Sequence, residues 1–391
     1  MTMTSPHVTD RVIRDADSHI VEPPGWFENY ASSHVLENTS KGILGSDLPL
    51  FKKLVERGAQ RVAGEHADVT EAMKQDLYGH RERMTQWTAF GAYDSTERVE
   101  SLDIVGISSQ LVFPGVNLGR VRTKDLDVRY GAAEALNRGM VDFCGADDRL
   151  LGVGFLPFDD PTTTLESAKR DIERGIKAFM IPTDAINGRS PAHVDYHPIW
   201  ALLEEAGVPI TLHIGSGKQF TAVYMETGEK RELNNPISNV EATKPHDLPV
   251  LHHSIERWLT AMIYFGVLEK FPKLMIGIIE LGSNWVPATL MNLDIGSSAL
   301  GRFDVTLQNL SMKPSEFFRR QVRVAPLHME DSGWVLKNVG PEILMFNTDY
   351  PHPEGGRDPF GAFQRSLDAA GATSEELDRF YSRNFEELMG L

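Results

Sequence analysis

The sequence predicts a single domain with a (β/α)8 barrel fold, and three observations lead to this prediction. Eight short apolar runs, each typical of a buried strand, recur along the 391 residues. Stretches with helical periodicity separate most of these runs, and repeated βα units imply a parallel sheet with right-handed crossovers. Metal-ligand types of side chain follow several runs directly, as they do in barrels whose sites lie at the carboxyl ends of the strands.

The alternative fold is an open, doubly wound sheet. Such sheets often bind a nucleotide through a glycine-rich turn after a strand, and no such fingerprint follows any predicted strand here. We therefore favour the closed barrel. Its predicted strands cover residues 12–16, 109–113, 150–156, 176–181, 208–213, 274–279, 322–326 and 343–346. The predicted helices cover residues 98–105, 125–145, 163–174, 199–206, 255–271, 314–320 and 333–339.

Two long stretches interrupt the alternation. Residues 23–96 are too many for an ordinary βα connection, and their aromatic side chains, among them Trp26, Trp87 and Phe90, are too many for a solvated linker. We predict a helical insertion after the first strand that covers the top of the barrel as a lid and contributes to a dimer contact. Residues 216–251 form a second irregular stretch at the same face. The domain prediction is thus one barrel, 1–391, with a lid-like insertion at about 23–96.

Charge and composition exclude several classes of partner. A net charge of −16 argues against nucleic acid and against an anionic membrane. The single cysteine, Cys144, excludes an internal disulfide and fits a reducing cytoplasm, which is the predicted location. The first residues lack the features of a signal peptide, and no apolar run approaches the roughly 20 residues of a membrane span. The expected partner is therefore a small molecule.

Four residues form the predicted metal site. Asp17 and His19 stand at alternate positions of an extended segment, so both side chains point the same way and can hold one ion. His213 ends the run PITLH, where an imidazole needs a partner; a core histidine bonded to the backbone is the alternative. Asp349 follows the last predicted strand and is predicted both as a ligand and as a catalytic group. Two carboxylates and two imidazoles suit a divalent metal with an open position.

Other residues are candidates for catalysis or substrate binding. Glu280 ends the sixth predicted strand, where a buried carboxylate is costly unless it acts as a base, a supporting partner or an extra ligand. His328 is predicted as a general acid or base, with an ordinary loop histidine as the alternative. His352, Arg357 and His252 are candidate substrate-binding residues, although His352 could only order its loop and His252 could face solvent. Further candidates are Asp15 as a ligand or partner of the metal site, Glu22 as a loop carboxylate, and Arg120, Arg122 or Arg189 as the partner of an anionic substrate.

Five segments resemble the amidohydrolase-related family that includes aminocarboxymuconate semialdehyde decarboxylase and γ-resorcylate decarboxylase. They are DADSHIVEPP at 15–24, LHIG at 212–215, GVLEKFPKL at 266–274, ELGSNWVP at 280–287 and NTDYPHPE at 347–354. The resemblance runs from residue 12 to residue 391. It implies a (β/α)8 barrel with one divalent ion, zinc or manganese, held by Asp17, His19, His213 and Asp349. It also implies a homodimer.

One position departs from the family pattern. The decarboxylases carry a catalytic histidine at the sixth strand, where this chain has Glu280. The leading hypothesis is a metal-dependent, non-oxidative decarboxylase of an aromatic or unsaturated carboxylic acid, with Glu280, His252, His253 or His328 in place of that histidine. A metal-dependent hydrolase of an amide, lactone or ester is the alternative. A catalytically silent, ligand-binding barrel is the third, and the intact set of metal ligands argues against it.

Overall fold

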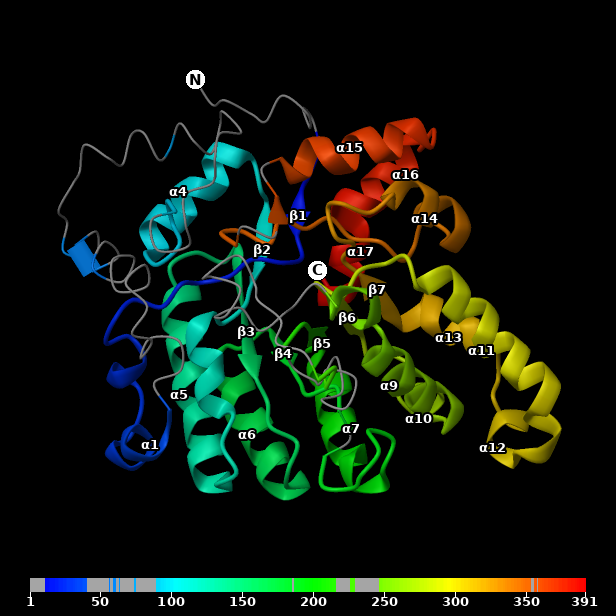
Figure 1. The fold of residues 1–391 in the computed structure, drawn as a ribbon, viewed down its shortest axis with the longest axis horizontal. Helices are drawn as coiled ribbons and strands as arrows, with labels where there is room; N and C mark the ends of the chain where they lie inside the picture. Colours follow the sequence, from blue (N-terminus) through cyan, green and yellow to red (C-terminus); the bar gives the residue numbers. More distant parts are fainter. Residues whose placement is uncertain are drawn as a thin grey trace.

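The structure is a computed structural model, and it describes residues 11–40, 56, 59–60, 63, 74, 89–184, 186–215, 226–228, 246–352, 355–356 and 358–391. Seven parallel strands form one sheet in the order β1-β2-β3-β4-β5-β6-β7, so each strand pairs with the next along the chain. The helices surround this sheet (Figure 1). The strands are β1 Arg14–Asp15, β2 Ser109–Val112, β3 Leu150–Phe155, β4 Ala178–Met180, β5 Ile210–His213, β6 Ile276–Ile279 and β7 Val322–Val324.

The eighth predicted strand is an extended segment, 343–346, that joins both of its neighbours. The amide of Val324 donates to the carbonyl of Ile343 at 2.8 Å, and the amide of Met345 donates to the carbonyl of Val324 at 2.8 Å. On the other side, the amide of Ala16 donates to the carbonyl of Phe346 at 3.0 Å. These bonds connect β7 to β1 through the segment, so the chain has the (β/α)8 barrel fold that the sequence predicts.

The predicted helices are present, with one break. Residues 255–271 form two helices, because Gly266 adopts a φ of 72° and ends the first of them. The helices are α1 Ser33–Asn38, α4 Ser95–Val105, α5 Leu126–Cys144, α6 Pro161–Arg174, α7 His197–Ala206, α9 His253–Tyr264, α10 Val267–Lys270, α11 Val286–Leu300, α12 Val305–Gln308, α13 Pro314–Gln321, α14 Ser332–Val339, α15 Pro359–Ala369, α16 Ser374–Asp378 and α17 Asn384–Met389. Short 3-10 helices include η1 Phe27–Asn29, η3 Val116–Val121 and η7 Gly301–Phe303.

The strands bury both faces, as the near-continuous apolar runs predict. One cluster of buried residues joins the outward-facing side chains of the strands, such as Phe179 and Ile278, to the surrounding helices. A second cluster contains the inward-facing ones, such as Val153 and Met180, together with Leu388 of α17. The barrel interior is therefore a packed core, and the polar site can form only beyond the strand ends.

The insertion is described at its two ends, 23–40 and 89–96, and at five residues between them. Trp26 packs against α5, where a Cβ atom at Gly139 would lie 2.3 Å from its ring. Phe90 is buried, and its carbonyl accepts a 2.6 Å hydrogen bond from the hydroxyl of Tyr350. Trp87 lies outside the described residues. Among the helices that the structure describes, none is long and apolar enough to cross a membrane.

Candidate metal centre

Four of the predicted site residues converge at the carboxyl ends of the strands. Asp17 and His19 follow β1, His213 ends β5, and Asp349 follows the 343–346 segment. Nε2 of His19 lies 3.3 Å from Oδ1 of Asp17 and 3.5 Å from Oδ1 of Asp349. Nε2 of His213 lies 3.5 Å from the same oxygen of Asp17. The structure thus brings together the four side chains that the sequence predicts as metal ligands.

A fifth side chain, that of Glu280, joins this cluster from the end of β6. Its Oε2 lies 3.5 Å from Nε2 of His213. Asp17, His19, His213 and Glu280 each offer one ligand atom, and these atoms lie within 4.8 Å of one another. Glu280 therefore stands near the predicted metal and not in the solvent beyond the strand end.

The burial of this cluster indicates what it binds. The side chain of Asp17 is fully buried, and within the described part of the chain neither of its oxygens accepts a hydrogen bond. Nε2 of His19 is also buried and makes no hydrogen bond there. Buried polar atoms without partners are costly, and a buried carboxylate is more so. A divalent cation would satisfy these atoms, and carboxylate oxygens with imidazole nitrogens are ligands that zinc and manganese accept.

The pKa values within the cluster reflect the balance between burial and the charges of neighbouring side chains. Burial opposes the ionisation of Asp17, but the neighbouring imidazoles outweigh it and hold the pKa of Asp17 well below its usual range. Burial and the charge of His352 lower the pKa of His19 to about 3. Burial acts in the same direction on His213, yet Asp17 and Glu280 outweigh it and raise the pKa of His213 to about 9. The raised pKa of His213 shows that Asp17 and Glu280 favour positive charge beside them.

The backbone is strained at two residues of the cluster. Of the three non-glycine residues with positive φ in the described ranges, two are Glu280 at 57° and Asp349 at 52°. A side chain in this left-handed region costs roughly 1 kcal/mol or more. Such conformations persist where the surrounding structure holds them, and they often occur at functional sites. Here the strain directs both carboxylates toward His19 and His213.

Asp15 lies outside the groups of potential metal ligands in the described part of the chain, and its hydrogen bonds hold the chain behind them. Its carboxylate accepts hydrogen bonds from the amide and the hydroxyl of Thr348, at 2.8 and 2.6 Å, and from Nε2 of Gln110 at 2.7 Å. The amide of Asp17 also donates to it at 3.2 Å. Burial raises the pKa of Asp15 to about 6. Asp15 therefore holds the segment before Asp349 against the segment before Asp17.

Two aromatic rings frame the cluster. The ring of His352 stacks on that of His19 with 3.9 Å between centroids, and its Nδ1 lies 3.0 Å from Oδ1 of Asp349. Phe113, which follows β2, packs against His213 with 4.6 Å between ring centroids. Phe113 has no role among the sequence-based predictions, although its position at the end of a predicted strand is the signal that could have identified it.

The other candidates are absent from the two groups of potential ligand atoms around His19, or lie outside the described residues. His328 packs against Gly356, where a Cβ atom would lie 2.5 Å from its Nε2. His252 stacks on Trp285 with 5.9 Å between ring centroids, and it forms a separate group with His253 and Glu256. Arg357 is not among the described residues. Of the other candidates, the structure therefore places only His352 beside the potential metal ligands. His328 and His252 are not in that group.

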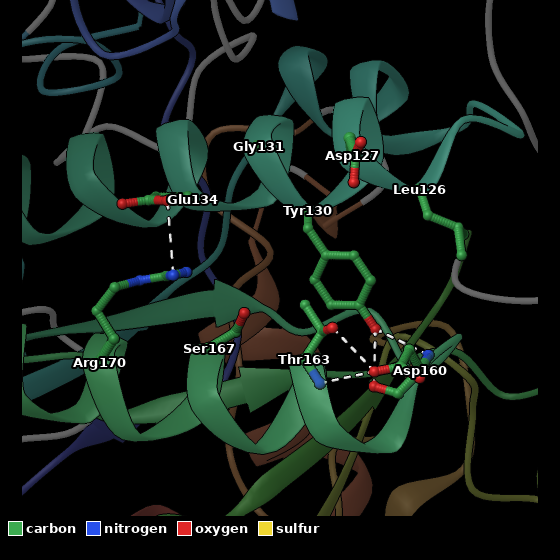
Figure 2. A pocket seen from close by; sticks show the side chains of 9 residues that line it. All are labelled: Leu126, Asp127, Tyr130, Gly131, Glu134, Asp160, Thr163, Ser167 and Arg170. Atoms are coloured by element: carbon green, nitrogen blue, oxygen red, sulfur yellow. Dashed lines mark hydrogen bonds and ion pairs between the residues drawn. The ribbon is translucent and has the colours of Figure 1, made fainter.

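Figure 2 shows a pocket on the outer flank of the barrel, between α5 and α6. Its volume is about 450 Å³, and an ion pair between Arg170 and Glu134 spans it. Asp160, which also lines it, accepts hydrogen bonds from Thr163. None of the metal-cluster residues lines this pocket, and three of its four charged side chains, those of Glu134, Asp160 and Arg170, already have partners. The cluster at the carboxyl ends of the strands therefore remains the candidate active site.

The sequence places this fold and site within a known family. A sequence profile described as Amidohydrolase matches residues 110–391, which is well over half of the chain. The chain therefore belongs to the amidohydrolase family. This agrees with the resemblance found in the sequence. No curated protein matches the chain.

Solved structures share the fold at low sequence identity. An amidohydrolase from Mycobacterium avium subsp. paratuberculosis is 20% identical with a TM-score of 0.71, over 98% of this chain and 100% of that one. A 5-carboxyvanillate decarboxylase from Novosphingobium aromaticivorans, with bound manganese and a hydroxymethoxynitrobenzoic acid, is 18% identical with a TM-score of 0.65 over 100% of both chains. A dihydroxybenzoic acid decarboxylase from Polaromonas, with manganese and 2-nitroresorcinol, is 13% identical with a TM-score of 0.62 over 97% of both chains.

Proposed function

We propose that this protein is a metal-dependent, non-oxidative decarboxylase of an aromatic or unsaturated carboxylic acid. The observation that carries the proposal is the convergence of Asp17, His19, His213, Asp349 and Glu280 at one end of the barrel, with both oxygens of Asp17 buried and lacking hydrogen bonds among the described residues. The fold that the chain shares with decarboxylases of hydroxylated benzoic acids supports the substrate class.

Asp17, His19, His213 and Asp349 would hold the metal, and Glu280 would be an additional ligand or a neighbour. Zinc is the ion that the sequence favours, with manganese as the alternative. With Glu280, the site has three carboxylates and two imidazoles. This larger share of oxygen donors suits manganese better than the four predicted ligands alone. A divalent ion there would act as a Lewis acid toward the carboxylate and an adjacent oxygen of the substrate.

Decarboxylation breaks the bond between a substrate carbon and its carboxylate, and a proton must replace the carbon dioxide. Glu280 is the proposed proton donor, since its carboxyl lies 3.5 Å from His213 and takes the place of the family's histidine. His352, stacked on His19 and close to Asp349, would hold that aspartate in position. Both roles need only modest movement of side chains that already face the site.

The contact between His352 and Asp349 also supports the alternative, hydrolysis. A carboxylate oriented by an imidazole at 3.0 Å can accept a proton from an attacking water. In that case the substrate would be an amide, a lactone or an ester. The two reactions share the metal ligands and differ in whether Asp349 accepts a proton or Glu280 donates one.

The insertion is proposed as a lid over this site. The hydrogen bond from Tyr350 to the carbonyl of Phe90 supports the proposal, because it fastens the end of the insertion to the residue next to Asp349. We likewise propose the homodimer that the family resemblance implies.

Metal analysis combined with two product assays tests the proposed function. Purified protein should retain about one equivalent of zinc or manganese, and Asp17→Asn should lose it. The loaded enzyme is then incubated in D2O with 2,6-dihydroxybenzoate and 5-carboxyvanillate. Decarboxylation would release carbon dioxide and leave one deuterium on the carbon that carried the carboxylate. Products of an ester and lactone panel, containing one oxygen from labelled water, would instead establish hydrolysis. Full activity in metal-free protein would overturn both.

A further inference from the structure

We propose that Arg122 binds a second anionic group of the substrate, at a distance from the group that reaches the metal. The inference rests on the proposed function and narrows its substrate to aromatic acids with two anionic groups. Arg122 follows η3, in the connection between β2 and α5. Its NH2 donates a 3.1 Å hydrogen bond to the carbonyl of Gly215, which stands two residues after His213.

This hydrogen bond carries Arg122 to the catalytic face. In the sheet order, β3 and β4 lie between β2 and β5, so this hydrogen bond joins the connections after two strands that are not neighbours. The same connection begins with Phe113, whose ring packs against His213. The connection after β2 therefore contacts the end of β5 at two points. Phe113 contacts His213, and Arg122 contacts Gly215. A ligand that extends from His213 toward Gly215 would therefore approach the guanidinium of Arg122.

The guanidinium of Arg122 is available for a ligand. It is exposed, and among the described residues it forms no ion pair. A guanidinium carries five N–H donors, of which the bond to Gly215 uses one. That bond fixes the group while leaving further donors for a carboxylate, which pairs with arginine through two parallel hydrogen bonds.

The other loop arginines that the sequence suggested are already engaged. Arg120 is buried, pairs with Glu28 at 2.7 Å and lies over the ring of Phe27. Arg189 pairs with Asp195 at 3.2 Å. Of the candidate arginines in the described part of the chain, Arg122 alone stands at the catalytic face without a carboxylate partner.

The charge of the site explains why such a residue matters. Asp17, Asp349 and Glu280 surround the metal position, and the chain carries a net charge of −16. Coordination to the divalent ion would hold one substrate carboxylate at the metal, but a second carboxylate away from the ion would meet a negative surrounding. Arg122 provides the compensating charge there, so it favours a dianionic over a monoanionic acid.

A pair of ligands that differ in one carboxylate tests this. The full chain, loaded with Mn²⁺ and with its metal content measured, is titrated by calorimetry with 2-hydroxybenzoate and with 2-hydroxy-5-carboxybenzoate. The variants are Arg122→Met, Arg122→Lys and, as a control, Arg138→Met on α5. Wild type and control should bind the dicarboxylate more tightly. Arg122→Met should weaken dicarboxylate binding by about 10- to 100-fold and change 2-hydroxybenzoate binding by less than about twofold, with Arg122→Lys between them.

Three results would overturn the inference. The wild type could bind the two ligands equally, Arg122→Met could leave dicarboxylate binding unchanged, or it could weaken both ligands alike. In each case the proposed function would still stand if the wild type retained its metal and bound 2-hydroxybenzoate. Loss of metal, or no binding of either ligand by the loaded wild type, would instead remove the proposed function and this inference with it.

Discussion

At the level of single residues, Glu280 and Asp349 have a strained backbone within the candidate metal site. Both have positive φ and both direct a carboxylate toward the two imidazoles. Neither conformation follows from the local sequence, since glycine is the residue that adopts this region without strain. The chain therefore keeps a destabilising conformation at two positions where the carboxylates have a use.

Replacing Glu280 by glutamine should separate its chemical role from its structural one. The amide keeps the size of the side chain but cannot donate or accept a proton at neutral pH. We expect kcat to fall by about 100-fold or more, with little change in the melting temperature. Steady-state kinetics and thermal unfolding measure the two effects, and Glu375→Gln on the exposed face of α16 is the control. Near-normal kcat would remove Glu280 from the mechanism and leave His352 as the nearest alternative.

Glu22 is a second residue whose environment the sequence did not reveal. The sequence predicts a loop carboxylate, and the structure buries it completely. Its oxygens accept hydrogen bonds from the amides of Gly115 at 2.8 Å and Asn117 at 3.5 Å. Burial nevertheless raises the pKa of Glu22 to about 7. The connection after β2 is thus held by a carboxyl that is easier to protonate in the folded chain.

This shift predicts a pH dependence of stability. Between the unfolded pKa near 4.5 and the folded pKa near 7, the folded chain binds more protons, so stability falls as pH rises through this window. Glu22→Gln, which resembles the protonated acid, should flatten the fall, with a difference from wild type of about 2 kcal/mol between pH 5 and pH 8. Urea unfolding at both pH values measures it. Parallel curves for the two proteins would mean that Glu22 does not titrate in this range.

At the level of elements, a buried network holds the strand ends together behind the metal ligands. Arg98 of α4 donates to the carbonyls of Gly91 at 2.6 Å and His19 at 2.5 Å, and to Oε1 of Gln110 at 3.1 Å. Gln110 of β2 in turn donates to Asp15, which binds Thr348. One chain of hydrogen bonds therefore connects the end of the insertion, β1, β2 and the segment before Asp349.

Arg98→Met should damage both stability and metal binding. The substitution leaves the buried carbonyls of Gly91 and His19 without their donor, which we expect to cost about 3 kcal/mol of unfolding free energy. Metal affinity should fall roughly 10-fold, because the partners that orient ligands usually matter to this extent. Denaturant unfolding and competition with a chelator measure the two quantities. Arg138→Met, which removes one hydrogen bond to Tyr30, should change both only slightly. Unchanged metal affinity in Arg98→Met would limit the network to stability.

At the level of the whole molecule, one region of this acidic protein exposes several large apolar side chains. Helix α11 and the short helices after it extend from the side of the barrel (Figure 1). Five large apolar side chains there are each more than half exposed, namely Met291, Ile295, Leu300, Phe303 and Val305. Large apolar side chains that are exposed on neighbouring elements are more typical of an interface than single scattered ones. This region is therefore the place where we expect the proposed homodimer to form.

Charge substitution tests this interface. Light scattering should give the mass of a dimer for the wild type at micromolar concentration. Met291→Lys combined with Ile295→Glu should give a monomer that keeps its melting temperature within a few degrees, since neither side chain belongs to the core. Thr162→Lys on α6 is the control and should remain a dimer. A dimer that survives the double substitution would move the interface to the insertion, and a monomeric wild type would remove the proposal.

The sequence by itself determined the order of the βα units and the four converging residues Asp17, His19, His213 and Asp349. Both follow from local patterns: apolar runs define the strands, and parallel strands bring all their carboxyl ends to one face. The tertiary structure decided what depends on contacts between distant segments. It orients Glu280 through a strained backbone, buries Glu22 and Arg98, and keeps His252 in a separate group with Trp285. The reason is that burial and partner choice arise from packing across the barrel, whereas periodicity records only which face of its own element a residue occupies.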